Sequence, residues 1–267
     1  MGIKLIVIGA AGRMGGRILG LAAGDGGFDI VAAIDAQGHP DIGKNLGLTG
    51  AKGPINIQLT DKFPVAAADV VIDFSMPDAT AKTIDYCLEK GVPLVLGTTG
   101  LSEKQQEQVK TASGKIPLVY ATNMSVGMNV LFSLVGKVAK MLGPEYDTEI
   151  IEQHHRFKKD APSGTAMTLA EKICRETGMD FPGSVTYGRY GKDALRKKGT
   201  IGIHAVRAGD ITGIHSIIFA TPGETVTFNH SAGSRDTFVP GALRAAKWIV
   251  GKKPALYSMA DVLGIKG

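Results

Sequence analysis

The sequence contains little cysteine, few aromatic residues and no long apolar run. Cys87 and Cys174 are its only cysteines, too few for a disulfide framework, so a reducing compartment is expected. The apolar runs fall well short of the roughly 20 residues that a membrane helix needs. The N-terminal stretch lacks the basic region and the cleavage site of a secretory leader. We therefore expect a cytoplasmic protein with no membrane partner.

Strongly basic patches are also scarce. The formal net charge is only +5, and the charges are scattered along the chain. Outside residues 152–166, the densest basic run is Arg196, Lys197 and Lys198, which suits an exposed turn. Because nucleic-acid binders usually concentrate basic residues on one face, we expect no nucleic-acid partner. A mild positive excess does suit small anionic ligands, which the field of a protein can steer into a cleft.

Apolar residues make up 44% of the 267 residues, enough for a packed core, and their pattern divides the chain in two. Up to about residue 120, apolar runs alternate with helical stretches, which predicts an α/β fold with a Rossmann-like doubly wound parallel sheet. A helical stretch, a strand that ends at the adjacent histidines (147–155) and a second helical stretch follow, and then short strands between turn residues. This order predicts a second α+β domain with a mixed or antiparallel sheet. We expect domains at 1–125, completed by the helical tail 236–267, and at 126–235.

A glycine-rich turn joins the first apolar run to the first helical stretch. Gly9 permits the tight turn, Gly12 lets the backbone approach a pyrophosphate, and Gly15 lets the helix pack closely on the strand. The helix start would offer N–H groups to the phosphates, and an acidic residue that ends the next strand can bind an adenosine ribose. An ordinary glycine-rich turn is the alternative. The pattern predicts a dinucleotide site formed by Gly9, Ala10, Ala11, Gly12, Arg13, Met14 and Asp35.

Three later strand ends carry residues suited to the nicotinamide half of this site. Ligands of open α/β sheets lie outside the carboxyl ends of the strands. Each of these turns alone could be plain turn chemistry, but three in succession favour a pocket. The expected lining residues are Phe74, Gly97, Thr98, Thr99, Ala121, Thr122, Asn123 and Met124.

The sequence leaves the choice between NADH and NADPH open. The Asp35 carboxylate would repel the 2′-phosphate of NADPH, and Ala36 beside it supplies no positive charge. Arg13 could still reach a 2′-phosphate, with His39 or Lys44 in support. We expect NADH to be usable, and NADPH stays an alternative.

The segment EQHHRFKKDAPSGTA, residues 152–166, combines adjacent histidines, lysines and a helix start. Ser163 is placed as an N-cap, and the helix N-terminus can hold a carboxylate through backbone N–H groups. Gly164 leaves room for a ligand to approach. A histidine can exchange a proton near neutral pH, and a lysine supplies a second positive charge. The combination predicts a site that binds and protonates a small anion.

Two other interpretations of this segment need weighing. Adjacent histidines could bind a metal ion, but the HExxH spacing and a nearby cysteine are missing, so no metal is expected. A solvated loop could also carry such charges. Because neighbouring residues of a strand point to opposite faces, we expect one histidine to face a ligand and the other a structural partner.

Four segments together resemble the dihydrodipicolinate reductases (4-hydroxy-tetrahydrodipicolinate reductases) of lysine and diaminopimelate biosynthesis. The segments are VIGAAGRMGGRI at 7–18, GTTG at 97–100, NMSVGMNV at 123–130 and EQHHRFKKDAPSGTA at 152–166. The likeness continues over 207–248 and so covers nearly the whole chain. The histidine block is far more specific than the glycine turn.

The resemblance implies an NAD(P)H-dependent reduction that gives tetrahydrodipicolinate and releases a hydroxyl as water. The substrate would be a six-membered nitrogen ring with two carboxylates. The resemblance gives His154 the acid/base role and makes Lys158 a proton donor that also meets the substrate. It implies substrate contacts from His155, Gly164 and Thr165, to which the helix start adds Ser163.

The resemblance also assigns the second domain to substrate binding and to the formation of a homotetramer through sheet edges. One position departs from the family. Some members have an arginine directly after the acidic ribose-binding residue, and this chain has Ala36 there. A 2′-phosphate would therefore find no cation at that position.

Two other functions are not excluded by the residues alone. Another two-domain nicotinamide oxidoreductase would share the glycine turn but not the histidine block. A regulator that senses NAD(H) would bind the dinucleotide without turnover, and it would need a DNA-binding or partner module. The sequence contains no basic recognition helix.

Overall fold

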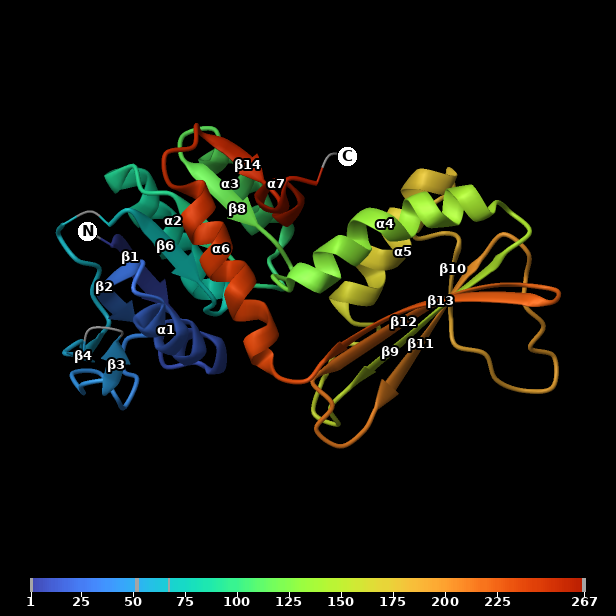
Figure 1. Ribbon diagram of the computed structural model, residues 1–267, viewed down its shortest axis with the longest axis horizontal. Coiled ribbons are helices and arrows are strands. Elements are labelled where there is room, and N and C mark those ends of the chain that lie inside the picture. Colours follow the sequence, from blue (N-terminus) through green and yellow to red (C-terminus); the bar gives the residue numbers. More distant parts are fainter. Residues whose placement is uncertain (1, 51–52, 67, 266–267) are drawn as a thin grey trace. The chain divides into compact units, whose positions relative to one another are not determined.

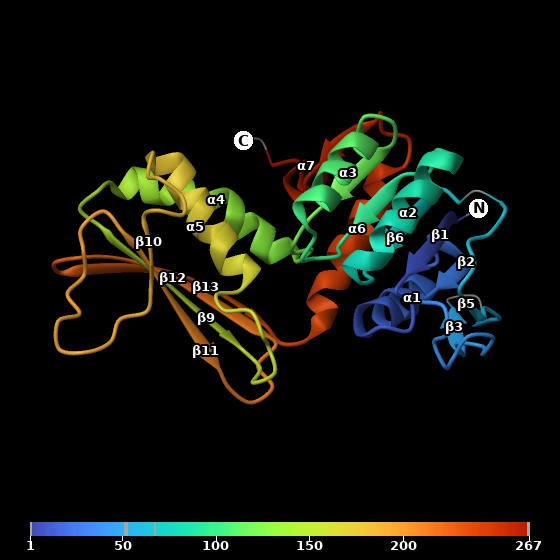
Figure 2. The ribbon, with the colours of Figure 1, turned by 180° about the vertical axis from the view of Figure 1, so that it is seen from behind.

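A computed structural model of the chain describes residues 2–50, 53–66 and 68–265. The described residues form two compact units. One comprises the residues up to Val126 together with those from Phe238 onwards, and the other comprises Gly127–Thr237. The chain therefore enters the second unit once and returns to the first (Figures 1 and 2).

The first unit is built on a seven-stranded sheet in the order β14-β8-β7-β6-β1-β2-β5. All neighbouring strands pair in parallel, which confirms the predicted Rossmann-like sheet. β1 lies between β2 and β6, so the direction of winding reverses there, and ligands of such sheets bind at that crevice. The strands are β1 (Ile3–Ile8), β2 (Phe28–Ile34), β5 (Leu59–Thr60), β6 (Val70–Asp73), β7 (Leu94–Leu96), β8 (Pro117–Tyr120) and β14 (Ala255–Tyr257).

Helices cover both faces of this sheet. On one face, α1 (Arg13–Asp25), α6 (Val239–Ile249) and α7 (Met259–Leu263) bury the inward side chains of β1 and β6 (Figure 1). On the other face lie α2 (Pro77–Lys90) and α3 (Glu103–Ser113) (Figure 2). The predicted start and stop signals act as expected, since Pro77 opens α2 and Gly91 closes it at φ 66°.

Two parts of the first unit were not anticipated. Residues 36–66 received no assignment from the sequence, and they hold β5 and a hairpin of β3 (Leu48–Gly50) and β4 (Gly53–Ile55). The tail was expected to be helical, but β14 pairs with β8 and extends the sheet. Strands of two or three residues are too short to show a period. β5 and β14 in addition pair with β2 and β8, which lie far away in the sequence.

The second unit contains a mixed five-stranded sheet in the order β10-β11-β9-β12-β13, as predicted. β10, β11 and β9 run parallel, and β12 and β13 are antiparallel to their neighbours. The strands are β9 (Asp147–His154), β10 (Val185–Tyr187), β11 (Ile201–Arg207), β12 (Gly213–Thr221) and β13 (Glu224–Ala232). A short 3-10 helix, η1 (Arg235–Phe238), leads back to α6.

Two helices, α4 (Val126–Leu142) and α5 (Gly164–Thr177), lie on the same side of this sheet (Figures 1 and 2). Their core includes Ile150, Ile217 and Phe219 from the strands and Leu169 and Ile173 from α5. β9 alternates, with its even-numbered residues buried and its odd-numbered residues from 149 to 153 only partly buried. This alternation places Ile150, Glu152 and His154 on the helix-covered face. Across the described ranges, no helix has the length and apolarity needed to cross a bilayer.

Candidate active site

The glycine turn after β1 is shaped by close backbone contacts. Gly9 has φ 75°, and a Cβ there would lie 2.6 Å from the Phe74 carbonyl oxygen. A Cβ at Gly15 would lie 2.0 Å from the Gly9 carbonyl oxygen. α1 then begins after Gly12 without a side-chain cap. Gly9 and Gly15 can therefore carry no side chain, and the start of α1 leaves helix N–H groups for an anion such as a pyrophosphate.

Asp35 closes this turn from the end of β2. One carboxylate oxygen accepts a hydrogen bond from the Ala11 amide at 2.8 Å, and the other accepts one from the Ala36 amide at 2.8 Å. Ala10 is buried, Met14 is partly buried, and Ala36 is exposed. An acidic group thus stands beside the glycine turn, in the position from which a ribose hydroxyl could be bound.

The next strand ends are joined by polar contacts. Asp73, fully buried at the end of β6, accepts hydrogen bonds from the Ser75 amide and hydroxyl at 2.8 and 2.6 Å. The Thr98 hydroxyl donates to the same carboxylate oxygen at 3.1 Å. The ring of Phe74 packs on Gly97, where a Cβ would lie 2.3 Å from Cζ. Gly97 can therefore carry no side chain.

The remaining predicted cofactor residues follow β7 and β8. Thr99 and Thr122 are exposed, and Met124 is buried. The Asn123 side-chain oxygen accepts a hydrogen bond from the Ser125 amide at 2.9 Å. Because all strands of the sheet are parallel, these residues share the carboxyl edge with the glycine turn.

The second group of predicted residues lies where β9 ends and α5 begins. His154 is the last residue of β9 and is 9% exposed. Ser163 is the N-cap of α5, and its hydroxyl accepts a hydrogen bond from the Ala166 amide at 3.2 Å. The helix start therefore forms as predicted, with Gly164 in its first turn. A Cβ at Gly164 would meet no atom within 4 Å, so the backbone there is open to a ligand.

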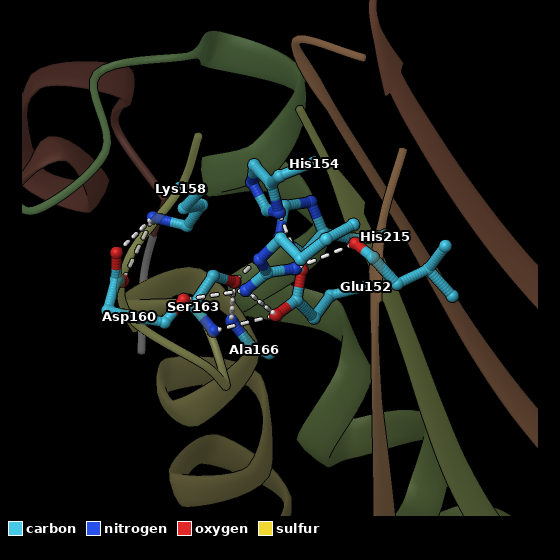
Figure 3. A network of polar contacts seen from close by, with 9 residues as sticks. Glu152, His154, Lys158, Asp160, Ser163, Ala166 and His215 are labelled. Carbon is cyan, nitrogen blue, oxygen red and sulfur yellow. Dashed lines mark hydrogen bonds and ion pairs between the residues drawn. The ribbon is translucent and has the colours of Figure 1, made fainter. Parts of the chain in front are cut away.

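Glu152 connects these elements (Figure 3). One carboxylate oxygen lies 2.5 Å from Nδ1 of His154 and accepts a hydrogen bond from Arg207 at 2.8 Å. The other oxygen accepts hydrogen bonds from the Ser163 amide at 3.0 Å and from Arg207 at 2.8 Å. Burial alone would raise the pKa of Glu152, but the hydrogen bonds from His154 and Arg207 outweigh it and lower that pKa to about 2. Glu152 is therefore an ionised carboxylate inside the unit.

His215 of β12 completes the buried network. Its Nε2 lies 3.1 Å from the Ser163 hydroxyl, and its ring meets the His154 ring edge-on with centroids 5.1 Å apart. Burial, together with the neighbouring His154, lowers the pKa of His215 to about 3. His215 is therefore neutral near pH 7. Among the described residues, no three histidine, cysteine or acidic side chains are grouped so as to hold a metal ion.

Lys158 lies in the loop between β9 and α5, where its ammonium pairs with the Asp160 carboxylate at 2.8 and 2.9 Å (Figure 3). Burial tends to raise the pKa of Asp160, but the hydrogen bond from Lys158 outweighs it and lowers that pKa. Arg207 donates to the Asp160 carbonyl oxygen at 2.6 Å. His155 is partly buried, with its ring 6.4 Å from that of Phe157. The loop that carries Lys158 is thus tied to the Glu152 network.

Sequence reasoning missed Asp73, Glu152, Arg207 and His215. A signal for Glu152 was present, because residues two apart on a strand share a face, and Glu152 and His154 are so spaced. Arg207 and His215 come from β11 and β12, and no local pattern links them to β9.

Comparison with known proteins agrees with this architecture. The family described as "Dihydrodipicolinate reductase, N-terminus" matches residues 3–124, and "Dihydrodipicolinate reductase, C-terminus" matches residues 127–263. The chain is 43% identical over 267 residues to the 4-hydroxy-tetrahydrodipicolinate reductase of Thiobacillus denitrificans, covering 100% of both chains. It is also 43% identical over 266 residues to that of Syntrophus aciditrophicus, covering 99% of each chain.

Solved structures show the same fold. The dipicolinate-bound dihydrodipicolinate reductase of Paenisporosarcina sp. TG-14 superimposes with a TM-score of 0.70 at 23% identity, covering 98% of this chain and 99% of that one. An amine dehydrogenase from Mycobacterium smegmatis is more distant, with a TM-score of 0.57 at 13% identity over 97% of this chain and 95% of that one. On the family match over both halves and the identity over the full length, the chain belongs to the dihydrodipicolinate reductases, the 4-hydroxy-tetrahydrodipicolinate reductases of lysine biosynthesis.

Proposed function

We propose that this chain reduces 4-hydroxy-tetrahydrodipicolinate with NADH or NADPH, and that His154 and Lys158 transfer the protons. The observation that carries the proposal is the His154 ring, which Glu152 holds beside the N-terminus of α5. A proton-transfer group and an anion-binding helix start occur together there, as reduction of a dicarboxylate requires. In this proposal the first unit binds the dinucleotide and the second unit binds the substrate.

The first unit fits a nicotinamide dinucleotide. The close contacts exclude a side chain at Gly9 and at Gly15, and the start of α1 offers N–H groups for the pyrophosphate. Asp35 would hold the ribose, and Phe74, Thr98 and the turn after β8 would line the nicotinamide half. When bound, the reduced cofactor supplies a hydride. Because Ala36 adds no cation beside Asp35, NADH is the expected cofactor and NADPH the second choice.

The second unit fits a small ring with two carboxylates. One carboxylate would lie at the start of α5, where Gly164 is open and the helix dipole favours an anion. Lys158 would pair with the other, and His155, Ser163 and Thr165 would add contacts. Charge-assisted hydrogen bonds of this kind are stronger than hydrogen bonds between neutral groups.

The proton chemistry falls to His154 and Lys158. Reduction of the conjugated imine moves electron density to the adjacent ring carbon, which then takes up a proton. Nδ1 of His154 is engaged by Glu152, so Nε2 is the ring atom that can exchange a proton with a substrate. A positioned acid of this kind typically contributes about 10²- to 10⁴-fold.

The test is a His154→Ala variant assayed by loss of NADH absorbance with freshly generated substrate. We expect kcat to fall by about 10²-fold or more, while NADH binding, followed by fluorescence titration, stays near that of the unaltered protein. Equal loss of cofactor binding would contradict the role of His154. An unaltered protein that binds NADH and never turns over this substrate would instead be a sensor.

We also infer that the chain is a cytoplasmic homotetramer assembled through the sheet of the second unit. The face of β9 opposite α4 and α5 carries Glu149, Ile151 and Gln153, which are only partly buried within one chain. Ile151 among them is an aliphatic residue only partly buried on a sheet face, which suits packing against a further copy. Light scattering after size exclusion should give four times the chain mass, and a monomer would rule the assembly out.

A further inference from the structure

We propose that Glu152 is a positioning residue of the reaction, which holds the His154 ring with Nδ1 protonated and Nε2 free to exchange a proton. The inference rests on the proposed function of His154. It adds a residue that would not touch the substrate and would act through the ring. It also joins that ring to the start of α5 and to the loop of Lys158.

The contacts of Glu152 leave little freedom. The side chain is 0% exposed, and each of its two oxygens has two partners. A carboxylate has about four lone-pair sites, so all of them are used. The partners come from β9, β11 and the N-cap of α5, so the carboxylate joins three elements at one point.

The charge of Glu152 decides which nitrogen of His154 carries the proton. An ionised carboxylate only accepts hydrogen bonds, so Nδ1, at 2.5 Å, must donate. In the neutral ring the lone pair is then on Nε2. Nε2 has no hydrogen-bond partner among the described residues, and Gly213 faces it, where a Cβ would lie 3.2 Å away. The absence of a side chain at Gly213 keeps Nε2 accessible.

Arg207 extends the effect to the loop. It binds both oxygens of Glu152 and, at 2.6 Å, the carbonyl oxygen of Asp160, whose carboxylate pairs with Lys158. Glu152 therefore sets the place of both proton-transfer candidates at once. A purely structural ion pair with Arg207 would explain the burial of Glu152, but it would not require the bond to His154.

The first experiment uses the unaltered protein. Long-range ¹H–¹⁵N NMR at alkaline pH reports which ring nitrogen is protonated, and the His154 signals are assigned by their loss in His154→Ala. We expect the Nδ1–H form alone. Protonation at Nε2, or a mixture of the two forms, would overturn the proposal without any change to Glu152.

The second experiment compares E152Q with E149Q. Glu149 is a matched control, because it lies on the same strand and contacts His204 at 2.7 Å and Arg189 at 2.6 Å. A glutamine amide can donate to Nδ1, so E152Q is expected to populate the Nε2–H form, whereas E149Q should leave the His154 signals unchanged. We expect kcat of E152Q to fall by about 10²-fold, with KM changed only a few-fold, and E152D to recover part of the loss.

The outcomes separate this inference from the proposed function. If the unaltered protein turns over and E152Q keeps both its kcat and the Nδ1–H form, Glu152 is not a positioning residue, and the role of His154 stands. If E152Q does not fold, the NMR result on the unaltered protein still decides. If the unaltered protein shows the Nδ1–H form but no turnover, the proposed function fails instead.

Discussion

The Thr98 hydroxyl donates a hydrogen bond to the Asp73 carboxylate at 3.1 Å and so joins the ends of β7 and β6. The same oxygen of Asp73 also holds the amide and hydroxyl of Ser75. One fully buried carboxylate thus fixes two turns at the carboxyl edge of the parallel sheet. The position of Phe74, between Asp73 and Ser75, depends on it.

Replacing Asp73 tests this connection. In Asp73→Ala three hydrogen bonds to a charged group are lost, so we expect the free energy of unfolding to fall by about 2 kcal/mol or more and NADH to bind more weakly. Asp69→Asn is the control. Asp69 directly precedes the first residue of β6, is exposed, and accepts a hydrogen bond from the Lys4 amide. Chemical denaturation and NADH titration measure both effects. Equal behaviour of the two variants would show that Asp73 does not organise the turns.

The glycine turn offers a matched pair on one helix. In Gly15→Ala the new methyl would lie 2.0 Å from the Gly9 carbonyl oxygen, so α1 would have to move away from β1. Overpacking of this kind costs about 1–3 kcal/mol. Gly20→Ala meets nothing within 4 Å and should gain about 0.5–1 kcal/mol from helix propensity. Thermal unfolding would show opposite shifts, and a stabilised Gly15→Ala variant would refute the close approach.

Cofactor preference should respond to Asp35 and Ala36. Asp35→Ala removes the ribose partner and the repulsion of a 2′-phosphate, so NADH affinity should fall by roughly tenfold and NADPH affinity by less. Ala36→Arg leaves Asp35 in place and adds a cation at an exposed position, so NADPH should bind more tightly. Titration of each variant with both cofactors measures the ratio. If neither substitution alters it, the adenosine ribose lies elsewhere.

His215 makes stability depend on pH. Its pKa is lowered to about 3 in the folded chain from 6.5. Between these values the unfolded chain binds the proton and the folded chain does not, so stability is lost as the pH falls below about 6.5. Lowering the pH from about 7 to about 5 should therefore reduce the free energy of unfolding by about 2 kcal/mol through His215 alone. Urea denaturation of His215→Gln should show a free energy of unfolding that falls by about 2 kcal/mol less over this pH range. If the fall is unchanged, a group other than His215 causes it.

Much of the architecture could be predicted from local patterns. The apolar runs of β1 and β6 read as buried parallel strands, and Ser163 before Gly164 marked the start of α5. The bond between Glu152 and Arg207 joins residues 55 apart in the sequence, and it forms only because β9 and β11 pair in register. Such contacts depend on strand order, which periodicity does not encode.

The first unit is finished by the last part of the chain. α6 buries Val239, Ala246 and Ile249 against the sheet, and β14 pairs with β8 at its edge. A nascent chain that ends near Val126 has α1 on this apolar sheet face but leaves the part that α6 and α7 cover exposed. During synthesis the first unit can complete its fold only after the residues from Phe238 onwards are made. The second unit is synthesised before them and can fold first. Truncation just before Phe238 should therefore yield an aggregating protein, although every residue of the glycine turn is present.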